Sequence, residues 1–494
     1  SNRGIIGEYS VIRNCRQIKN VKFGPYSQVT GCTRLENGSV NSNEFAPVKL
    51  GAGILAENFI VSSGAEISDG TIISNCFIGQ GCILGKQYSA ENSLFFANCQ
   101  GFHGEACSIF GGPYTVTHHK STLLIAGMFS FCNAGSGSNQ SNHMYKLGPI
   151  HHGIVERGSK TTSDSYILWP AKIGAFTLVM GRHYKNTDTS DLPFSYLIEN
   201  KDDSWIAPGV NLRSVGTIRD VMKWPRRDRR KDPEKLDCIN FNLLSPFTIK
   251  KMQKGLDILN SLKEISGETT EVFAYRNTLI SKSALEKGIN LYDKAIYKFL
   301  GNSVISRLEK CNVQTMEELT DCLKPKHSIG EGEWSDLAGL IAPKTEISKL
   351  IKRIERKELA SLEEIEQEFK NLHDHYYEYE WIWASELLVE KTGKKIEDLT
   401  INDLISLIKR WKESVIGLDQ MLYEDAKKEF RLDSMTGFGM DGNKTTQKLD
   451  FEKVRGNFES NDFVNEIVSH IERKTLLGEK MLEKLATIEK SYHN

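Results

Sequence analysis

Histidines, whose side chains can transfer protons or bind metals, gather in one stretch of the chain. Seven of the twelve lie between residues 103 and 183, at positions His103, His118, His119, His143, His151, His152 and His183. The unperturbed pKa of histidine, about 6.5, suits it to acid–base work at neutral pH, and its ring nitrogens are common metal ligands. The cluster predicts a general acid–base site or a metal site, against the alternative that these side chains line a subunit contact.

Two pairs of adjacent histidines stand out within this stretch. Successive side chains of a β-strand point to opposite faces, so one of His151 and His152 is expected to face outward, and the same holds for His118 and His119. The segment Pro149-Ile150-His151-His152-Gly153 is the best local candidate for proton transfer. For a metal, one member of each pair plus His143 or His183 would supply three ligands.

Cations accompany the histidines at two places. Arg182, His183 and Lys185 lie together in the segment 181–186, and arginine suits forked contact with carboxylate or phosphate. Residues 219–231 contain seven Lys or Arg and two Asp, among them Arg226 and Arg227. These groups predict binding of an anionic ligand, such as the phosphates of CoA or a sugar nucleotide. For 219–231 we favour a different use, pairing with the acidic second half of the chain.

The elements that position these residues follow a repeat of about 17 residues. Apolar side chains recur at steps of 6, 6 and 5 in two runs: Ile6, Ile12, Ile18, Phe23, Val29, Leu35 and Val40, then Leu50, Ala56, Val61, Ile67, Ile73, Ile78 and Leu84. Neither a helix nor an alternating strand has this spacing. Three short strands per turn of a triangular coil would produce it.

The residues around these positions follow one pattern, an aliphatic residue followed by glycine, two turn residues and a small residue. It appears in 6–11, 23–28 and 78–83, and returns in 173–178 and 206–211. The pattern resembles the hexapeptide-repeat, or trimeric LpxA-like, superfamily of left-handed parallel β-helices. We expect such a β-helix over residues 1–218, with inserted loops around 41–49 and 86–160 where the repeat fades.

The resemblance implies two ways to use histidine. Hexapeptide acyltransferases use one histidine as general base on a hydroxyl or amine, with an acyl-CoA or carrier thioester lying between neighbouring β-helices. On this reading His151 or His152 is the catalytic base, Arg182, His183, Lys185, Arg226 and Arg227 bind the ligand, and the substrate is a sugar or nucleotide sugar. The γ-class carbonic anhydrases instead hold a metal between subunits that activates water. In that alternative the protein is a metal-dependent hydratase or hydrolase with a divalent metal, and His118, His119 and His143 are the candidate ligands. A non-catalytic trimeric scaffold is the third hypothesis.

The second half of the chain has a different composition. From about residue 235 the sequence is rich in Lys, Glu and Leu, with apolar residues at helical spacing. Helices are predicted over 246–265, 283–309, 345–356, 361–390, 402–430 and 460–490, with Ser361 and Thr400 or Asn402 as caps. We therefore expect a basic linker over 219–234 and an all-α domain over 235–494. The whole layout resembles an uncharacterised bacterial family of LpxA-like proteins with a helical C-terminal domain.

Composition limits the remaining classes of function. The 494 residues carry a formal charge of -1, which argues against a nucleic-acid binder that works through overall basicity. No apolar stretch has the length of a membrane span, and the ten scattered cysteines include no CxxC pair. We expect a cytoplasmic homotrimer. Because the chain begins inside a coil without Met, we also expect an upstream segment to be missing.

Overall fold

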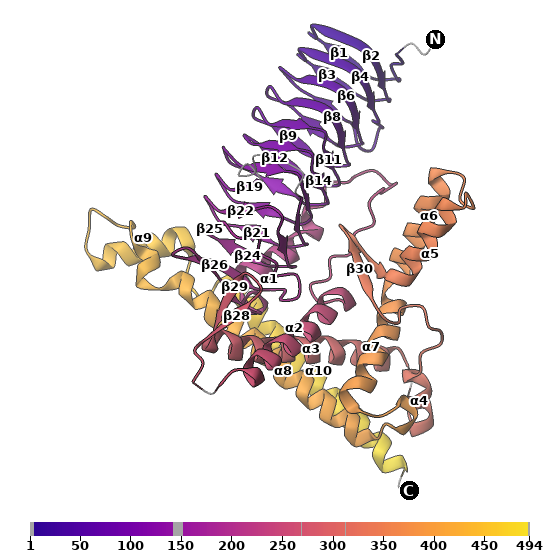
Figure 1. Cartoon of the computed structure of the whole chain (residues 1–494), viewed down its shortest axis with the longest axis vertical. Helices are drawn as coiled ribbons and strands as arrows, with labels where there is room; N and C mark the ends of the chain where they lie inside the picture. Colours follow the sequence, from indigo (N-terminus) through magenta and orange to yellow (C-terminus); the bar gives the residue numbers. More distant parts are fainter. Residues whose placement is uncertain (1–3, 142–151, 268, 312, 493–494) are drawn as a thin grey trace.

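The computed structural model describes residues 4–141, 152–267, 269–311 and 313–492. A parallel β-solenoid forms the N-terminal half, and a helical region follows it (Figure 1). The coiled N-terminal half and the helical second half predicted from the sequence are therefore both present.

The solenoid strands stack in three parallel columns. The first column runs in the order β1 (Val11–Arg13), β3 (Gln28–Thr30), β5 (Lys49–Leu50), β7 (Glu66–Ile67), β9 (Ile83–Gly85), β12 (Gln100–Phe102), β15 (Val116–Thr117), β18 (Asn133–Ala134), β21 (Lys160–Thr161), β24 (Leu178–Met180) and β26 (Tyr196–Asn200). The other two columns begin together in the long strands β2 (Gln17–Phe23), β4 (Arg34–Val40), β6 (Leu55–Val61) and β8 (Ile72–Ile78).

The two columns separate after β8. Its first half pairs with β10 (Ser89–Glu91), and its second half pairs with β11 (Leu94–Phe95). One column then continues through β13 (Glu105–Cys107), β16 (Leu123–Ile125), β19 (Asn139–Ser141), β22 (Tyr166–Leu168) and β25 (Arg182–His183). The other continues through β14 (Phe110–Gly111), β17 (Gly127–Phe129), β20 (Gly153–Val155) and β23 (Lys172–Ile173). Three columns give each coil three sides.

A ladder of asparagines marks the corner between these two columns. The Nδ2 groups of Asn20, Asn37, Asn58 and Asn75 each donate to the Oδ1 of the next asparagine in the ladder, which ends at Asn92, over 2.9–3.3 Å. All five residues have φ between 51° and 54°. Asparagine tolerates this left-handed backbone better than most residues, so one residue type both turns the corner and links adjacent coils.

The strand register explains the repeat of 17. Val11 pairs with Gln28 and Leu55 pairs with Ile72, each 17 residues further on. The recurring aliphatic side chains point inward, and Val29, Leu35, Ile78 and Leu84 are fully buried. Arg34 pairs with Leu55, so this coil is four residues longer, and it is the coil that contains residues 41–49.

Residues 86–141 continue the coils, which differs from the inserted loops expected there. Ser89 pairs with Glu105 and Glu105 pairs with Leu123, so the spacing alternates between 16 and 18 residues and loses the phase of 17. Small or polar residues also replace some inward aliphatic side chains: Gly101 and Thr117 follow Leu84 in register, and Gln140 follows Leu124. These changes hide the repeat from an analysis based on apolar spacing.

The chain then folds back on the solenoid. After the hairpin of β26 with β27 (Asp203–Ala207) come α1 (Val215–Lys223) and the 3-10 turn η2 (Pro225–Arg227). Residues 228–240 next follow the solenoid surface, where Asp228 accepts from Asn98, and Asp232 accepts from Asn43. Arg229 pairs with Glu66 of the solenoid, and Arg230 pairs with Asp228. Within the described chain, no Lys or Arg of 219–231 pairs with an acidic residue of the helical region, which differs from the pairing we expected.

The second half is helical but not all-α. Its helices are α2 (Pro246–Ile265), α3 (Lys282–Lys310), α4 (Met316–Leu323), α5 (Lys344–Glu355), α6 (Leu362–Asp374), α7 (Tyr376–Thr392), α8 (Ile401–Lys427), α9 (Lys444–Arg455) and α10 (Asp462–Tyr492). Ser361 and Thr400 form capping boxes with Glu364 and Asp403, as expected of caps. Two hairpins were not predicted, one of β28 (Val272–Tyr275) with β29 (Thr278–Ser281), the other of β30 (Trp334–Leu337) with β31 (Leu340–Pro343).

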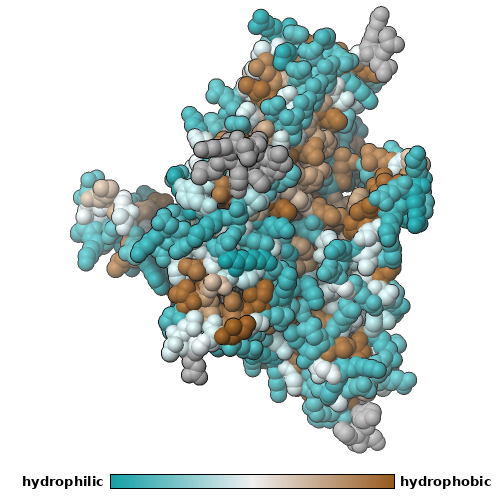
Figure 2. Space-filling view, viewed as in Figure 1, coloured by the Kyte–Doolittle hydropathy of each residue, from teal (hydrophilic) through white to brown (hydrophobic). Residues whose placement is uncertain are grey.

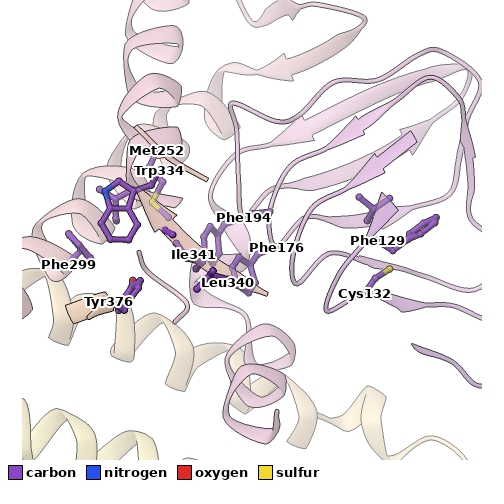
Figure 3. Packing of buried hydrophobic residues seen from close by; sticks show 14 of the residues in the cluster. Phe129, Cys132, Phe176, Phe194, Met252, Phe299, Trp334, Leu340, Ile341 and Tyr376 are labelled. Carbon is purple, nitrogen blue, oxygen red and sulfur yellow. The ribbon is translucent and has the colours of Figure 1, made fainter. Parts of the chain in front are cut away.

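One hydrophobic core joins the two halves. Phe176 and Phe194 stack in the last coils at 4.5 Å, and Leu340, Ile341 and Trp334 of the β30–β31 hairpin belong to the same buried cluster (Figure 3). At this junction Arg157 is 2% exposed and forms an ion pair with Asp336, Nε to Oδ2, at 3.0 Å. The β30–β31 hairpin thus helps to attach the helical region to the solenoid, together with the β28–β29 hairpin, whose β29 pairs with β27.

Two further features of the chain bear on its surface and covalent structure. Ile60, Phe77, Leu94 and Phe110 pair in register and form an outward apolar stripe, and Figure 2 shows hydrophobic residues on the side of the solenoid that faces α5 and α6. Cys311 and Cys322 form a disulfide that the scattered cysteine spacing did not predict. None of the helices in the described ranges combines the length and apolarity that a bilayer span requires.

Candidate anion-binding cleft

Trp224 fixes α1 and η2 against the side of the solenoid. Its ring lies 4.7 Å from that of Phe131 and 6.4 Å from that of Tyr114, measured between ring centroids. The Tyr114 hydroxyl donates to the Trp224 carbonyl over 2.9 Å. Two aromatic side chains of the coils therefore hold the residues that follow α1 in place, and a cleft remains between the helix and the strands.

This cleft has a volume of about 360 Å³ and is rich in cations. Lys160 of β21 lines it from the solenoid, and Arg219, Lys223 and Arg227 line it from α1 and η2. Asp220 is the carboxylate among the lining residues, and it already pairs with Lys160 and Arg219. Lys223 and Arg227 form no ion pair within the described ranges, so the cleft carries positive charge that no protein group neutralises.

The cations perturb one another. Burial lowers the pKa of Lys223, and the neighbouring charges of Arg219, Arg227 and Lys160 lower it further. Like charges held this close repel each other, and an anion that entered the cleft would relieve that repulsion. Phosphate and carboxylate groups fit such a site, because guanidinium and ammonium groups donate several charge-assisted hydrogen bonds to them.

His118 lies at the edge of the same cleft, just after β15. Its Nε2 lies 2.8 Å from Gln100 Oε1, and its ring stacks on Phe102 at 5.7 Å. Partial burial lowers the pKa of His118, which is exposed at the edge of the cleft, and the charges of His119, Arg227 and Lys86 lower it further. The imidazole is therefore neutral at pH 7. With the Gln100 oxygen as acceptor, Nε2 carries the proton and Nδ1 keeps a free lone pair that can accept one.

The other predicted histidines have different positions. His143 and His151 lie outside the described residues, and His152 is exposed immediately before β20. His119 is exposed beside His118. Among the residues with described placement, no three His, Cys, Asp or Glu side chains are arranged to hold a metal ion. The metal assignment of His118, His119 and His143 remains a prediction, since one of its members is not described.

The group at 182–185 does not converge on a cleft. Arg182 binds both carboxylate oxygens of Asp164 at 2.8 Å, and Lys185 pairs with Asp203 at 2.6 Å. His183 is 1% exposed; its Nδ1 accepts from the Ser204 hydroxyl at 2.7 Å, and its Nε2 donates to the Met180 carbonyl. Burial lowers the pKa of His183 to about 4, so this neutral ring packs inside the coil.

The cleft thus combines two predicted residues with several that sequence reasoning missed. His118 and Arg227 were assigned to different hypotheses, and the fold brings them to one site. Arg226, also predicted to bind ligand, is exposed and does not line the cleft. Arg219 and Lys223 had a signal in the high charge of residues 219–231, whereas Lys160 and Gln100 had none.

A β-solenoid that carries a cationic cleft and a packed helical region defines the class of this protein. Residues 1–263 match the family described as Domain of unknown function (DUF4954), and the chain belongs to that family. Residues 315–485 match a second model, Domain of unknown function (DUF6819).

A curated relative matches about half of the chain. It is described as an uncharacterized protein of Treponema pallidum (strain Nichols), and it is 26% identical over 271 residues. The match covers 53% of this chain and 36% of the relative, so the chain spans little more than a third of that protein's length.

Proposed function

We propose that the protein is an acyltransferase of the hexapeptide type, which binds the phosphates of an acyl-CoA donor in the solenoid cleft. The observation that supports this function is a neutral His118 beside unpaired cations in one cleft. A donor of this class carries several phosphates, and Lys223 and Arg227 offer charges that no protein group neutralises. The left-handed coil and the homotrimer expected from the resemblance stay predictions.

His118 supplies the base in this proposal. Its Nδ1 accepts the proton of a sugar hydroxyl as the hydroxyl oxygen attacks the thioester carbonyl. The tetrahedral intermediate collapses, the carbon–sulfur bond breaks, and the acyl group stays on the sugar oxygen. The imidazolium then returns its proton to the leaving thiolate, so atoms and charge balance. His151 and His152, assigned this role from the sequence, are tested alongside it.

The cations of the cleft can be tested by the binding of acetyl-CoA, measured by isothermal titration calorimetry. Lys223→Ala/Arg227→Ala should weaken binding at least tenfold, because each charge-assisted hydrogen bond contributes about 1.5–3 kcal/mol. Arg226→Ala/Lys231→Ala removes the same charge from outside the cleft and should change the affinity by less than twofold. Equal affinity in the two double variants, or no binding by the parent protein, would refute the site.

The base can be tested separately from binding. His118→Ala should keep the affinity for acetyl-CoA within threefold but abolish acetyl transfer to a panel of amino sugars and nucleotide sugars. His119→Ala, an exposed neighbour outside the cleft, is the matched control and should retain transfer. Transfer that survives in His118→Ala and disappears in His151→Ala or His152→Ala would move the base to the position first predicted from the sequence.

A further inference from the structure

A second and larger cavity lies in the helical region, where α3, α7 and α10 meet. Its volume is about 780 Å³, and its walls mix apolar side chains such as Phe299 and Trp381 with charged ones. It shares no lining residue with the solenoid cleft. Nothing in the proposed acyl transfer uses this cavity.

Two polar groups in the wall of the cavity, on consecutive residues of α7, lack hydrogen-bond partners. Trp381 is 6% exposed and lines the cavity, yet its indole Nε1 has no hydrogen-bond partner among the described residues. The buried Oε2 of Glu380, also in the lining, forms no hydrogen bond in the described structure, although the Tyr376 hydroxyl, which is also unpaired, lies near the carboxyl. Buried polar groups are nearly always paired, and each one left unpaired costs about 1–3 kcal/mol. A ligand that accepts from Trp381 and donates to Glu380 would satisfy both.

Burial changes the pKa of the Glu380 carboxyl in this wall. It raises the pKa of Glu380 to about 7, and the nearby Tyr376 hydroxyl opposes the rise. No cation is paired with the Glu380 carboxyl in the described structure. This environment suits a neutral or weakly basic donor, such as a ring N–H or an exocyclic amine, better than a strongly solvated ammonium group.

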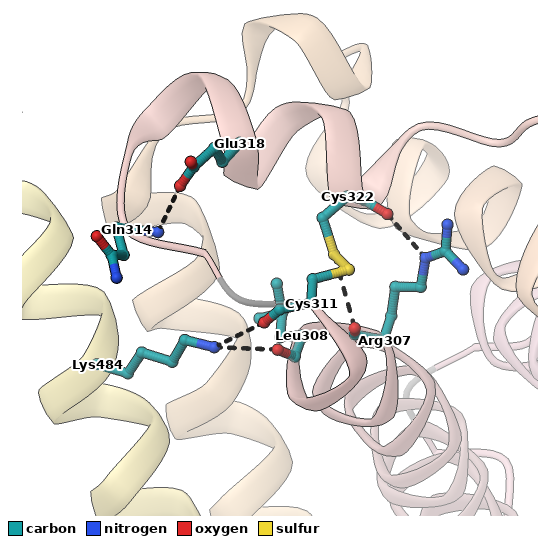
Figure 4. Close-up of a disulfide and its surroundings, with 7 residues drawn as sticks. All are labelled: Arg307, Leu308, Cys311, Gln314, Glu318, Cys322 and Lys484. Atoms are coloured by element: carbon teal, nitrogen blue, oxygen red, sulfur yellow. Dashed lines mark hydrogen bonds between the residues drawn. A yellow bond between two sulfur atoms is a disulfide. The ribbon is translucent and has the colours of Figure 1, made fainter.

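Cations surround the rest of the cavity. Lys310, Lys326 and Lys474 line it without an ion pair in the described part of the chain, and the first two are exposed. Of the lining carboxylates besides Glu380, Glu378 is paired with His327, and Glu309 is exposed without an ion pair in the described ranges. Arg307 is held in place: its Nε donates to the Cys322 carbonyl at 2.8 Å, beside the disulfide (Figure 4), and its guanidinium lies over the Trp381 ring. These unpaired lysines suit an anionic group on the same ligand.

We propose that this cavity binds a nucleoside monophosphate, whose base pairs with Trp381 and Glu380 and whose phosphate contacts the lysines. A nucleobase has a planar apolar face and carries donors and acceptors along its edge, so it can supply the acceptor that Trp381 lacks and a donor to Glu380. One phosphate matches the lysines, and the cavity is large enough for such a ligand. The site is independent of acyl transfer in the solenoid.

The test titrates AMP, GMP, CMP and UMP, each with its nucleoside and with inorganic phosphate, into the full chain by calorimetry. The protein carries Lys223→Ala/Arg227→Ala, so that the solenoid cleft does not contribute. At least one monophosphate should bind, at least tenfold more tightly than its nucleoside or inorganic phosphate. Binding by none of the four, or equal binding of inorganic phosphate alone, would overturn the proposal.

Three variants then locate the ligand. Trp381→Phe keeps the ring but removes the indole N–H and should weaken binding about tenfold, and Glu380→Gln should do the same. Lys474→Ala should weaken binding about fivefold, whereas Lys480→Ala, on the same helix but outside the cavity, should leave it unchanged. Melting temperatures show whether each variant is folded. Affinity that is unchanged in both Glu380→Gln and Lys474→Ala would place the nucleotide elsewhere and overturn the assignment.

Discussion

Two buried charged side chains of this molecule differ in whether an opposite charge is paired with them. At the junction of the two halves, Arg157 pairs with Asp336, donates through Nη2 to the carbonyls of Asn240 and Gly339, and lies over the Phe131 ring, although its Nε forms no hydrogen bond in the described structure. In the helical cavity, no cation of the described chain pairs with Glu380, and its Oε2 forms no hydrogen bond. A buried charge is tolerated when an opposite charge and hydrogen-bonding groups surround it, and it destabilises the fold when they are missing. The first arrangement therefore joins two regions, and the second leaves a place for a ligand.

The largest expected effect comes from removing one partner of the Arg157–Asp336 ion pair. Arg157→Met leaves Asp336 buried without its cation, and should lower the free energy of unfolding by about 3–5 kcal/mol. Denaturant unfolding followed by circular dichroism measures the change. Arg157→Met/Asp336→Leu removes both charges and should recover more than half of the loss. A double variant as unstable as the single one would show that packing, and not the unpaired charge, dominates at this junction.

A smaller effect of opposite sign is expected at the incomplete site. Because the pKa of Glu380 in the folded protein is about 7, above its value near 4.5 when unfolded, the folded state binds the extra proton between these values. The free energy of unfolding therefore falls as pH rises from 4.5 to 7. Glu380→Gln should be more stable than the parent at pH 8, by about 3 kcal/mol, and no more stable at pH 4.5. A difference that does not vary with pH would contradict this origin.

The smallest effect is expected at an exposed pair. Arg182 and Asp164 contact each other through two short hydrogen bonds, as close as those at the junction, but water surrounds both side chains. Solvent screening and side-chain entropy cancel most of the attraction. Arg182→Ala should leave the melting temperature unchanged within error, in low and in high salt. A marked loss of stability would mean that burial is not what separates the three sites.

The sequence predicted the part of the fold that repeats. Val29, Leu35 and Ile78 are inward and buried because each coil imposes the same spacing on the next. The coils of 86–141 were missed because spacings of 16 and 18 replace that of 17, and small or polar residues such as Thr117 and Gln140 replace inward aliphatic ones. The β30–β31 hairpin was missed because its apolar residues pack on α2, α6 and α7, outside the hairpin itself, which leaves no local period.

The candidate site was predicted in pieces. His118 and Arg227 were both named from residue type, but they are 109 positions apart, and α1 brings them together by folding back on the solenoid. His183 was named on the same grounds and proved to be buried, because a histidine gives no sign in the sequence of which side of a coil it faces. Glu380 and Trp381 were read as part of an amphipathic helix, since a missing partner is visible only in three dimensions.

The asparagine ladder has a mechanical consequence. Its amides, like the backbone hydrogen bonds of the strands, point along the solenoid axis and join each coil only to its neighbours. The first coils lie at the far end of the molecule from the C-terminus (Figure 1), so tension applied between the two ends acts along much of this axis. Such a load would break the hydrogen bonds between neighbouring coils one coil at a time, so the solenoid would extend in steps of one coil.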